Sequence, residues 1–494
     1  MAWLMVNFGI SKSLVLVAQV LLGWILSPAD FGVYALSVAI TSLVTVFKDG
    51  GIRELLVQRW QEYDQLVGPV FWLGVCVNIV AGLVLAAVAP LAAIAYDEPA
   101  LMWMVLITAA WIPLSSTYSI QYVRLRLDLR FKTIAWLGLT SGVVRYGGQV
   151  ALALNGFGAV SFVLPLLATA VFEAIVGYAV TREWPWRHPV DMRRWPELLR
   201  EVRWIVWGNL MAGGLGQSYY LVVGLFVGKE VIGVYFFAMQ LLFHIESVIG
   251  NTLQQVLVPV LSRFKNDAER LGGASVRTIR ATMLITVPSV LGLAVVFPGI
   301  EQSITIWQGK WEPAIWPLIV LSVGYPLRMI LVGVASTVLQ AQGRWAAWAW
   351  LWTHNAVGLT IVAGVAGGVF RSPLAISIAV AAFLFATGFI STLSTVCHLG
   401  VPARIVIGSI VDVFLLGLFA AAASLYVEFE FGQSLQPLLR SALCGSMFGA
   451  IYLLAVRLVV PAHVSEGLSV LPGFIARPIA RVLRLPPPVP SGQP

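Results

Sequence analysis

Apolar runs long enough to cross a lipid bilayer recur along almost the whole chain. The first extends from Val6 to Leu26, and a membrane-spanning helix needs about 20 mostly apolar residues. It lacks a basic leader and a small-residue cleavage site, so we interpret it as a retained span rather than a signal peptide. Hydrophobic residues make up 59% of the 494 and charged residues 11%, whereas soluble domains have roughly 45–50% and about 25%. The sequence therefore predicts an all-α polytopic membrane protein.

Division of the chain at this length gives about fourteen predicted membrane-spanning helices. They cover residues 6–26, 32–47, 66–88, 100–122, 134–155, 159–180, 204–227, 232–256, 282–300, 314–339, 347–369, 374–397, 405–427 and 438–456. The second of these is free of charge but short.

Lysine and arginine are distributed unequally between the two sides of these spans. If the N-terminus is cytoplasmic, 24 of the 31 lie in cytoplasmic segments, 4 lie in outer segments and 3 lie within spans. Cytoplasmic loops of membrane proteins carry such an excess of positive charge. We therefore predict that both termini are cytoplasmic, and we attribute the net charge of +8 to loop placement rather than to nucleic-acid binding.

A repeated Gly-Val-Tyr sequence divides the spans into two halves. "SPADFGVYALSVAI" begins at Ser27 and "GKEVIGVYFFAMQL" begins at Gly228, so that Gly32 aligns with Gly233 at an offset of 201 residues. Each copy opens the second span of a six-span half. A repeat with an even number of spans has the same orientation in both copies, related by an axis along the membrane normal. The pattern predicts two six-helix bundles and, since duplicated bundles of this kind rock against each other, a transporter with alternating access.

The predicted domains follow from these divisions. They are an N-terminal six-helix bundle at residues 1–180, a cytoplasmic linker loop at 181–203, a C-terminal six-helix bundle at 204–397, an extra helix pair at 405–456 and a cytoplasmic tail at 457–494. The linker is rich in proline and arginine, and we expect it to contain a helix that lies on the membrane surface.

The segment from Leu21 to Arg59 resembles a known family. Its "LSPADFGVY", followed by "DGG" at 49–51 and Gln58, is similar to the N-terminal signature of Wzx-type bacterial polysaccharide flippases. "LRLDLRFKTIAW" at 125–136 and "LQAQGRW" at 339–345 resemble the basic exits from spans 4 and 10 in that family. The flippases belong to the multidrug/oligosaccharidyl-lipid/polysaccharide exporter superfamily, which also contains multidrug extruders and the lipid II flippase.

The resemblance implies a function and a location. Such flippases move isoprenoid diphosphate-linked oligosaccharides across the bacterial inner membrane for exopolysaccharide or O-antigen synthesis. Their fold implies two six-helix bundles around a central cavity, with the last two helices alongside. Contact with the glycan polymerase and export machinery, and H+ or Na+ as a coupling ion, are further expectations. No cofactor is implied.

Two arginines lie near the middle of predicted spans, one in each half. Arg145 is 11 residues from one end of its span and 10 from the other, and Arg328 is 14 and 11 residues from the ends of its own. At 1.5 Å per residue, both are roughly 16 Å from a surface, which is beyond the reach of a snorkelling side chain. We predict that both bind the substrate diphosphate bidentately in a wet cavity. Lys12, near the inner end of the first span, is a further candidate for substrate binding.

The alternative role for these arginines is charge pairing. Glu173 lies in the span after that of Arg145, and Glu246 lies at a depth similar to that of Arg328. Each pair would neutralise a charge that is costly inside a membrane. Glu173, Glu246 and His244 are also candidates for ion coupling, since histidine titrates near neutral pH.

Other chemistries have weaker support in the sequence. Three cysteines, Cys76, Cys397 and Cys444, lie within apolar runs and offer neither a disulfide framework nor a metal site. The outer segments are short and contain no nucleophile elbow or phosphate loop, so we expect no catalytic residue and no enzyme such as a polytopic glycosyltransferase or glycan polymerase. A multidrug or toxin antiporter is the main alternative, although it would favour acidic over basic residues in the cavity. Four tyrosines are candidates for stacking on a sugar: Tyr118, Tyr219, Tyr220 and Tyr325.

Overall fold

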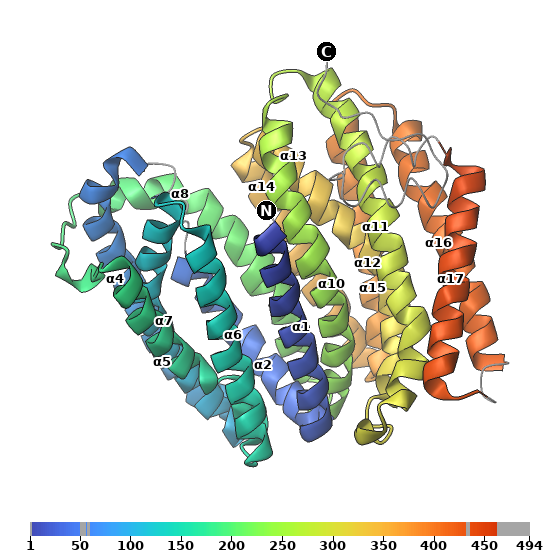
Figure 1. The fold of residues 1–494 in the computed structure, drawn as a ribbon, viewed down its shortest axis with the longest axis horizontal. Coiled ribbons are helices and arrows are strands. Elements are labelled where there is room, and N and C mark those ends of the chain that lie inside the picture. The colour runs from blue at the N-terminus through green and yellow to red at the C-terminus, as the bar shows by residue number, and fades with distance from the viewer. Residues whose placement is uncertain (1, 50–55, 57–59, 431–434, 462–494) are drawn as a thin grey trace. The chain divides into compact units, whose positions relative to one another are not determined.

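The computed structural model describes residues 2–49, 56, 60–430 and 435–461 (Figure 1). Over these residues the chain forms helices and no strand, which confirms the predicted all-α fold. The chain divides into two compact units. The first contains Met1–Gly233 and Trp352–Gly364, and the second contains Val234–Leu351 and Val365–Pro494. Each unit is described by itself below.

The first unit is a bundle of long helices that ends in a broken one. Its helices are α1 (Ala2–Ile25), α2 (Pro28–Asp49), α4 (Tyr63–Ala95), α5 (Pro99–Leu127), α6 (Phe131–Leu154), α7 (Pro165–Thr181), α8 (Trp195–Asn209) and α9 (Gly216–Gly224). Three short 3-10 helices, η1 (Trp60–Glu62), η2 (Gly158–Phe162) and η3 (Pro185–Arg187), lie between them. A π-helical segment, η4 (Leu210–Leu215), joins α8 to α9.

The second unit begins within α10 (Lys229–Ser262) and continues to the end of the described chain. It contains α11 (Ala268–Ser303), η5 (Thr305–Trp307), η6 (Glu312–Ala314), α12 (Ile315–Ile330), the π-helical η7 (Leu331–Ala335), α13 (Ser336–Ala341), α15 (Pro373–Cys397), α16 (Ala403–Glu430) and α17 (Pro437–Val459). The helix α14 (Trp345–Phe370) starts and ends in the second unit, while its middle part belongs to the first.

Eleven helical segments in the described part of the chain are long and apolar enough to cross a membrane. They correspond to eleven of the predicted spans. The other three predicted spans coincide with α1, α6 and the run from α8 to α9. In α6, Lys132, Arg145 and Gln149 lower the mean hydropathy of the helix. The run from α8 to α9 is interrupted by the π-helical segment η4. The chain is thus a multi-pass membrane protein, while the count of fourteen stays a prediction.

The Ser-Pro-Ala-Asp sequence forms the N-terminal cap of α2. The Ser27 backbone N–H and hydroxyl donate to the Asp30 carboxylate at 2.9 and 2.7 Å, and the Asp30 N–H donates to the Ser27 hydroxyl at 3.2 Å. This reciprocal arrangement is a capping box, which satisfies N–H groups that the helix leaves unpaired. Pro28 occupies the first helical position, where its missing N–H costs nothing. The motif therefore fixes where α2 begins.

The two repeated glycines contact each other's helix in a reciprocal way. A Cβ on Gly32 would overlap the Lys229 carbonyl oxygen, and a Cβ on Gly233 would overlap the Pro28 carbonyl oxygen. The offset of 201 residues carries Pro28 to Lys229 and Gly32 to Gly233, so equivalent positions exchange equivalent contacts. A two-fold axis generates this pattern. The contact lies wholly within the first unit, and it shows why both copies require glycine.

Polar contacts surround this glycine contact. The Lys229 ammonium lies 2.6 Å from the Glu98 carboxylate, and the Tyr96 hydroxyl donates to the Leu221 carbonyl at 2.9 Å. Burial raises the pKa of Tyr96 to about 12, so its hydroxyl stays protonated at neutral pH. These bonds tie the loop between α4 and α5 to the ends of α9 and α10.

The segment between α7 and α8 packs against the first bundle. The Trp72 indole donates to the His188 carbonyl at 2.8 Å, and the Trp186 indole donates to the Thr117 hydroxyl at 2.9 Å. The Glu183 carboxylate accepts from the Tyr63 hydroxyl at 2.9 Å. The helix α8 covers the end of the predicted linker and continues through η4 into α9, while the position of this helix on the membrane surface stays a prediction. Hydrogen-bonding tryptophans, which composition does not reveal, thus hold this segment on α4 and α5.

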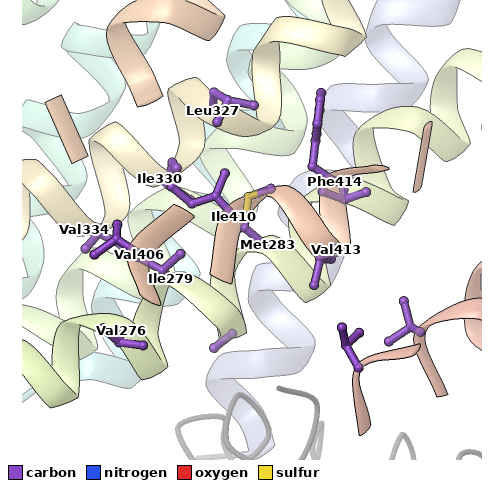
Figure 2. Close-up of a cluster of buried hydrophobic side chains, with 14 of the residues drawn as sticks. Val276, Ile279, Met283, Leu327, Ile330, Val334, Val406, Ile410, Val413 and Phe414 are labelled. Carbon is purple, nitrogen blue, oxygen red and sulfur yellow. The ribbon is translucent and has the colours of Figure 1, made fainter. Parts of the chain in front are cut away.

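The core of the second unit joins the terminal helix pair to the rest of the unit (Figure 2). Apolar side chains at helical spacing on three helices meet there: Val276, Ile279 and Met283 of α11, Leu327 and Ile330 of α12, and Val406, Ile410, Val413 and Phe414 of α16. Helix α17 packs against both α11 and α16. Arg280 of α11 donates from Nε to the Ser409 hydroxyl of α16 at 3.0 Å. The pair is therefore an integral part of this unit.

Candidate functional site

Arg328 lies where α12 departs from regular helical geometry. Pro326 is two residues earlier, inside the helix, and the π-helical η7 starts at Leu331. Proline removes a backbone donor from the helix, and π-helical segments often occur at functional sites. The local backbone therefore marks this part of α12 as a candidate site.

Arg328, Glu246 and Tyr325 form a hydrogen-bonded cluster in the second unit. Arg328 Nε and the Tyr325 hydroxyl both donate to Glu246 Oε2, at 3.1 and 2.6 Å. The side chains of Arg328 and Glu246 are 19% and 11% exposed. A largely buried carboxylate that accepts two hydrogen bonds, one of them from a cation, is strongly stabilised. The pairing of Glu246 with Arg328, one of the two roles expected from the sequence, is thus present in the structure.

Arg145 in α6 has different surroundings. Its Nε is buried and has no hydrogen-bond partner among the residues that the structure describes. Its guanidinium carbon lies 5.6 Å from the centre of the Tyr146 ring, and its charge interacts with Tyr34 of α2. Glu173 makes an interaction of its own, and its pairing with Arg145 stays a prediction. The sequence gives the depth of both residues but not the helix faces on which they lie, so it does not decide this pair.

Other polar side chains lie on the same face of α6 as Arg145. Ser141 and Gln149 are four residues before and after it, which places all three on one helix face. Gln149 donates to the Phe162 carbonyl at 2.8 Å, and Tyr34 stacks on the Phe162 ring with their centres 4.1 Å apart. The tyrosine of the Gly-Val-Tyr motif therefore belongs to the surroundings of Arg145.

Several buried polar atoms of the first unit have no hydrogen-bond partner among the described residues. On α1, α2 and α6 they include Gln19 Nε2, Ser37 Oγ and Ser141 Oγ, in addition to Arg145 Nε, and others, such as Asn78 Oδ1 and Gln121 Oε1, lie on α4 and α5. Helices α1 and α6 pack together, with Leu14 3.4 Å from where Gly142 would carry a Cβ. Each unpaired buried group costs about 1–3 kcal/mol, and such groups need a reason, such as a bound ligand or water. Sequence reasoning missed Gln19, Ser37 and Ser141, because a single polar residue in a span gives no signal.

The remaining predicted residues are placed as follows. Lys12 lies in α1, but its side chain is outside the described part of the chain. His244 lies in α10 with a partly exposed side chain, and its carbonyl accepts from the Ser247 hydroxyl at 2.8 Å. Tyr219, Tyr220 and Tyr325 are at most 2% exposed, so their rings cannot stack on a sugar in this structure. Among the described residues, no group of three or more histidines, cysteines or acids could hold a metal ion.

Comparison with known families decides the assignment. Residues 21–313, which are more than half of the chain, match the family described as polysaccharide biosynthesis protein. The chain belongs to this family. The match includes the helix-capping motif, Arg145, Glu173, His244 and Glu246, and it ends before Arg328.

Two relatives of this polysaccharide biosynthesis protein are similar over most of its length. It is 25% identical over 300 residues to the succinoglycan biosynthesis transport protein ExoT of Rhizobium meliloti (strain 1021), covering 60% of each chain. It is 24% identical over 339 residues to the teichuronic acid biosynthesis protein TuaB of Bacillus subtilis (strain 168), covering 66% of this chain and 68% of TuaB. The chain therefore spans about three fifths of ExoT and two thirds of TuaB.

Solved structures with the same fold are also membrane transporters. The inward closed conformation of the lipid II flippase MurJ has a TM-score of 0.70 at 16% identity, covering 92% of this chain and 99% of MurJ. An inward-facing multidrug resistance MATE transporter of the MOP superfamily has a TM-score of 0.60 at 14% identity, covering 80% and 98%. At these identities the likeness establishes the fold of this family member, which agrees with the resemblance seen in its sequence.

Proposed function

We propose that this protein moves an isoprenoid diphosphate-linked oligosaccharide across the bacterial inner membrane, for exopolysaccharide or O-antigen synthesis. The observation that carries the proposal is the buried Nε of Arg145, which has no hydrogen-bond partner among the described residues and lies in α6, a predicted span. An arginine in this position is costly unless it faces protein, water or a ligand. The names of ExoT and TuaB, which refer to polysaccharide transport and biosynthesis, support an anionic glycolipid as that ligand.

The two midplane arginines have different roles in this proposal. Arg145 binds the diphosphate, because a guanidinium donates two parallel hydrogen bonds to phosphate oxygens. Arg328 also contacts the diphosphate, but Glu246 holds it at 3.1 Å in this structure. An arriving diphosphate would therefore compete with the Glu246 carboxylate. Lys12 adds a positive charge on α1.

Alternating access is the proposed mechanism. The two predicted bundles, at 1–180 and 204–397, rock about the two-fold axis indicated by the repeat, while the linker at 181–203, the extra pair at 405–456 and the tail at 457–494 stay on their predicted sides. Both termini are cytoplasmic in this proposal. Release of Glu246 from Arg328 would leave the Glu246 carboxylate free to bind H+ or Na+ as the coupling ion. His244 and Glu173 are further candidates for ion coupling.

Two other functions have less support. A multidrug cation antiporter has the same fold, and MATE transporters are among the structural neighbours, but Arg145 and Arg328 near the midplane favour an anionic substrate. A glycosyltransferase or glycan polymerase would need a catalytic cluster, and the sequence of the short outer segments contains no nucleophile elbow or phosphate loop. We therefore propose that the protein is not an enzyme.

The proposed function can be tested in proteoliposomes. The purified protein is reconstituted with a fluorescent isoprenoid diphosphate oligosaccharide in the inner leaflet, and membrane-impermeant dithionite reports its arrival outside. We expect transfer well above that of empty liposomes, with an unchanged mass of the glycolipid. Transfer equal to that of empty liposomes, or a covalently altered glycan, would contradict the proposal.

Substitutions at the Glu246–Arg328 pair are expected to couple in this transfer assay. Arg328→Ala leaves Glu246 without its cation, and we expect transfer to fall several-fold at matched membrane abundance. Adding Glu246→Ala removes the unpaired charge, which can be costly when buried. If Arg328 also contacts the diphosphate, the double substitution restores only part of the activity. Full recovery in the double variant would limit Arg328 to charge pairing.

A further inference from the structure

A pocket of about 660 Å³ lies in the second unit, where α11 and α16 end and α12 and α17 begin. These four helix termini lie on the side of the membrane that the sequence predicts to be the outer one. Its lining combines acids, an arginine, an amide and aromatic rings: Pro298, Gln302, Glu312, Pro313, Ile315, Trp316, Glu428, Phe429 and Arg440. None of these residues belongs to the diphosphate site proposed above.

A buried ion pair forms one wall of this outer pocket. Arg440 Nε lies 2.9 Å from Glu428 Oε1, and the two side chains are 7% and 1% exposed. Arg440 Nη2 also donates to Gln302 Oε1 at 2.7 Å. Arg440 is thus held between α11 and α16, and a ligand that needs a free cation would have to break these contacts.

The carboxylates in and beside the outer pocket differ in how far their acceptors are used. The Glu428 carboxylate is occupied, because Arg440 Nε lies 2.9 Å from its Oε1 and the Cys444 thiol lies beside it. A neighbouring pocket of about 260 Å³ shares Gln302 and Glu312 and is lined by Glu301. Glu301 is 2% exposed. Glu312, whose side chain is exposed, is therefore the carboxylate of the outer pocket that a ligand can reach, and Glu301 Oε1 beside it lacks a donor among the described residues.

An aromatic surface borders these acceptors. Trp316 stacks on Phe429, with ring centres 5.3 Å apart and an interplanar angle of 9°. The Trp316 side chain is 54% exposed, so its other surface is open. Flat aromatic faces give large contact area, and the indole adds a hydrogen-bond donor at its edge.

These features select one class of ligand. The outer pocket is lined by two glutamates and one arginine, and Arg440 is already paired with Glu428, so the pocket disfavours phosphates and uronic acids. The acids do not converge closely enough to hold a metal among the described residues. A neutral sugar offers hydroxyl donors for the exposed Glu312 carboxylate and a C–H face for Trp316. We propose that the outer pocket is a binding site for a neutral, hydroxyl-rich saccharide. That this saccharide is part of the exported glycan rests on the proposed function.

Saturation-transfer NMR on the full-length protein in lipid nanodiscs tests this site. The probes are glucose, galactose and N-acetylglucosamine, with galacturonic acid and glycerophosphoethanolamine as competing classes. We expect ring C–H signals from at least one neutral sugar and none from the other two probes. Trp316→Ala should weaken binding by roughly three- to tenfold, and Glu312→Gln should do the same through its lost acceptor. Both side chains are exposed, so neither change should prevent folding.

Matched controls separate the possible outcomes. Trp350→Ala removes a tryptophan that is also 54% exposed but lies outside the pocket, and it should leave the signal unchanged. The proposal would be overturned if no neutral sugar gave a signal, or if the Trp316→Ala and Glu312→Gln variants gave the same signal as the wild type. It would also be overturned if only glycerophosphoethanolamine or galacturonic acid gave a signal. Arg145→Ala should retain sugar binding, so that failure of transport and failure of this site are distinguishable.

Discussion

Replacement of Arg145 by alanine is expected to reduce glycolipid transfer at least tenfold, while the protein still inserts in the membrane. The physical reason is that Arg145 Nε has no hydrogen-bond partner among the described residues, so in the proposed role the alanine variant loses the contact with the diphosphate. A charge-assisted hydrogen bond contributes about 1.5–3 kcal/mol, which corresponds to roughly ten- to hundredfold. Transfer is measured in proteoliposomes with matched amounts of protein.

Two further variants show whether this loss reflects substrate binding. Arg145→Lys keeps the charge but cannot bind two phosphate oxygens in parallel, so it should recover only part of the activity. Arg277→Ala removes an exposed arginine of α11 and should behave as the wild type. If Glu173→Ala restored transfer in the Arg145→Ala background, Arg145 would be a charge-pairing residue instead.

Replacement of Gly32 or Gly233 by alanine is expected to abolish transfer and to lower the thermal unfolding midpoint. Each new Cβ would overlap a backbone carbonyl of the other helix, and a backbone atom cannot rotate away as a side chain does. Overpacking of this kind costs about 1–3 kcal/mol, and here it forces apart the starts of α2 and α10. Unfolding midpoints and transfer rates of the single and double variants test this expectation.

Gly138, which lies outside this contact, provides the control for these substitutions. A Cβ on Gly138 of α6 would meet nothing within 4 Å, so Gly138→Ala should leave both the midpoint and the transfer rate unchanged. If Gly32→Ala matched Gly138→Ala in both measurements, the reciprocal contact would be dispensable. If Gly32→Ala kept its midpoint but lost transfer, the contact would matter for movement rather than for stability.

Much of the fold was predictable, because each membrane-spanning helix is a continuous apolar run in the sequence. The length of the apolar runs located the long helices, and the Ser27–Asp30 sequence marked the start of α2. The repeat was visible as Gly-Val-Tyr, and the reciprocal contact of Gly32 and Gly233 explains the recurrence of its glycine. The span at 204–227 was predicted as one run, but its π-helical segment η4, and the start of its first helix α8 within the predicted linker, were not.

The candidate site was predictable only in part. Depth along a span identified Arg145 and Arg328 as buried charges, and similar depth suggested the pair of Arg328 with Glu246 that the structure contains. The same reasoning allowed a pair of Arg145 with Glu173, which stays a prediction, because depth does not give helix rotation. Gln19, Ser37 and Ser141 became apparent only once packing showed that their side-chain atoms are buried without partners.

The docking of the terminal helix pair on α11 has a consequence for biosynthesis. Arg280 of α11 finds its partner Ser409 only after roughly 130 more residues have been made, which takes about 6–26 s at ribosomal rates of roughly 5–20 residues per second. Arg440 pairs with Glu428 later still. During this interval the nascent second unit exposes an incomplete core and a basic side chain that awaits its acceptor. Newly made chains of this protein therefore depend on residues 403–459 for completion of this core, and a ribosome that stalls there releases a product that quality-control proteases can recognise.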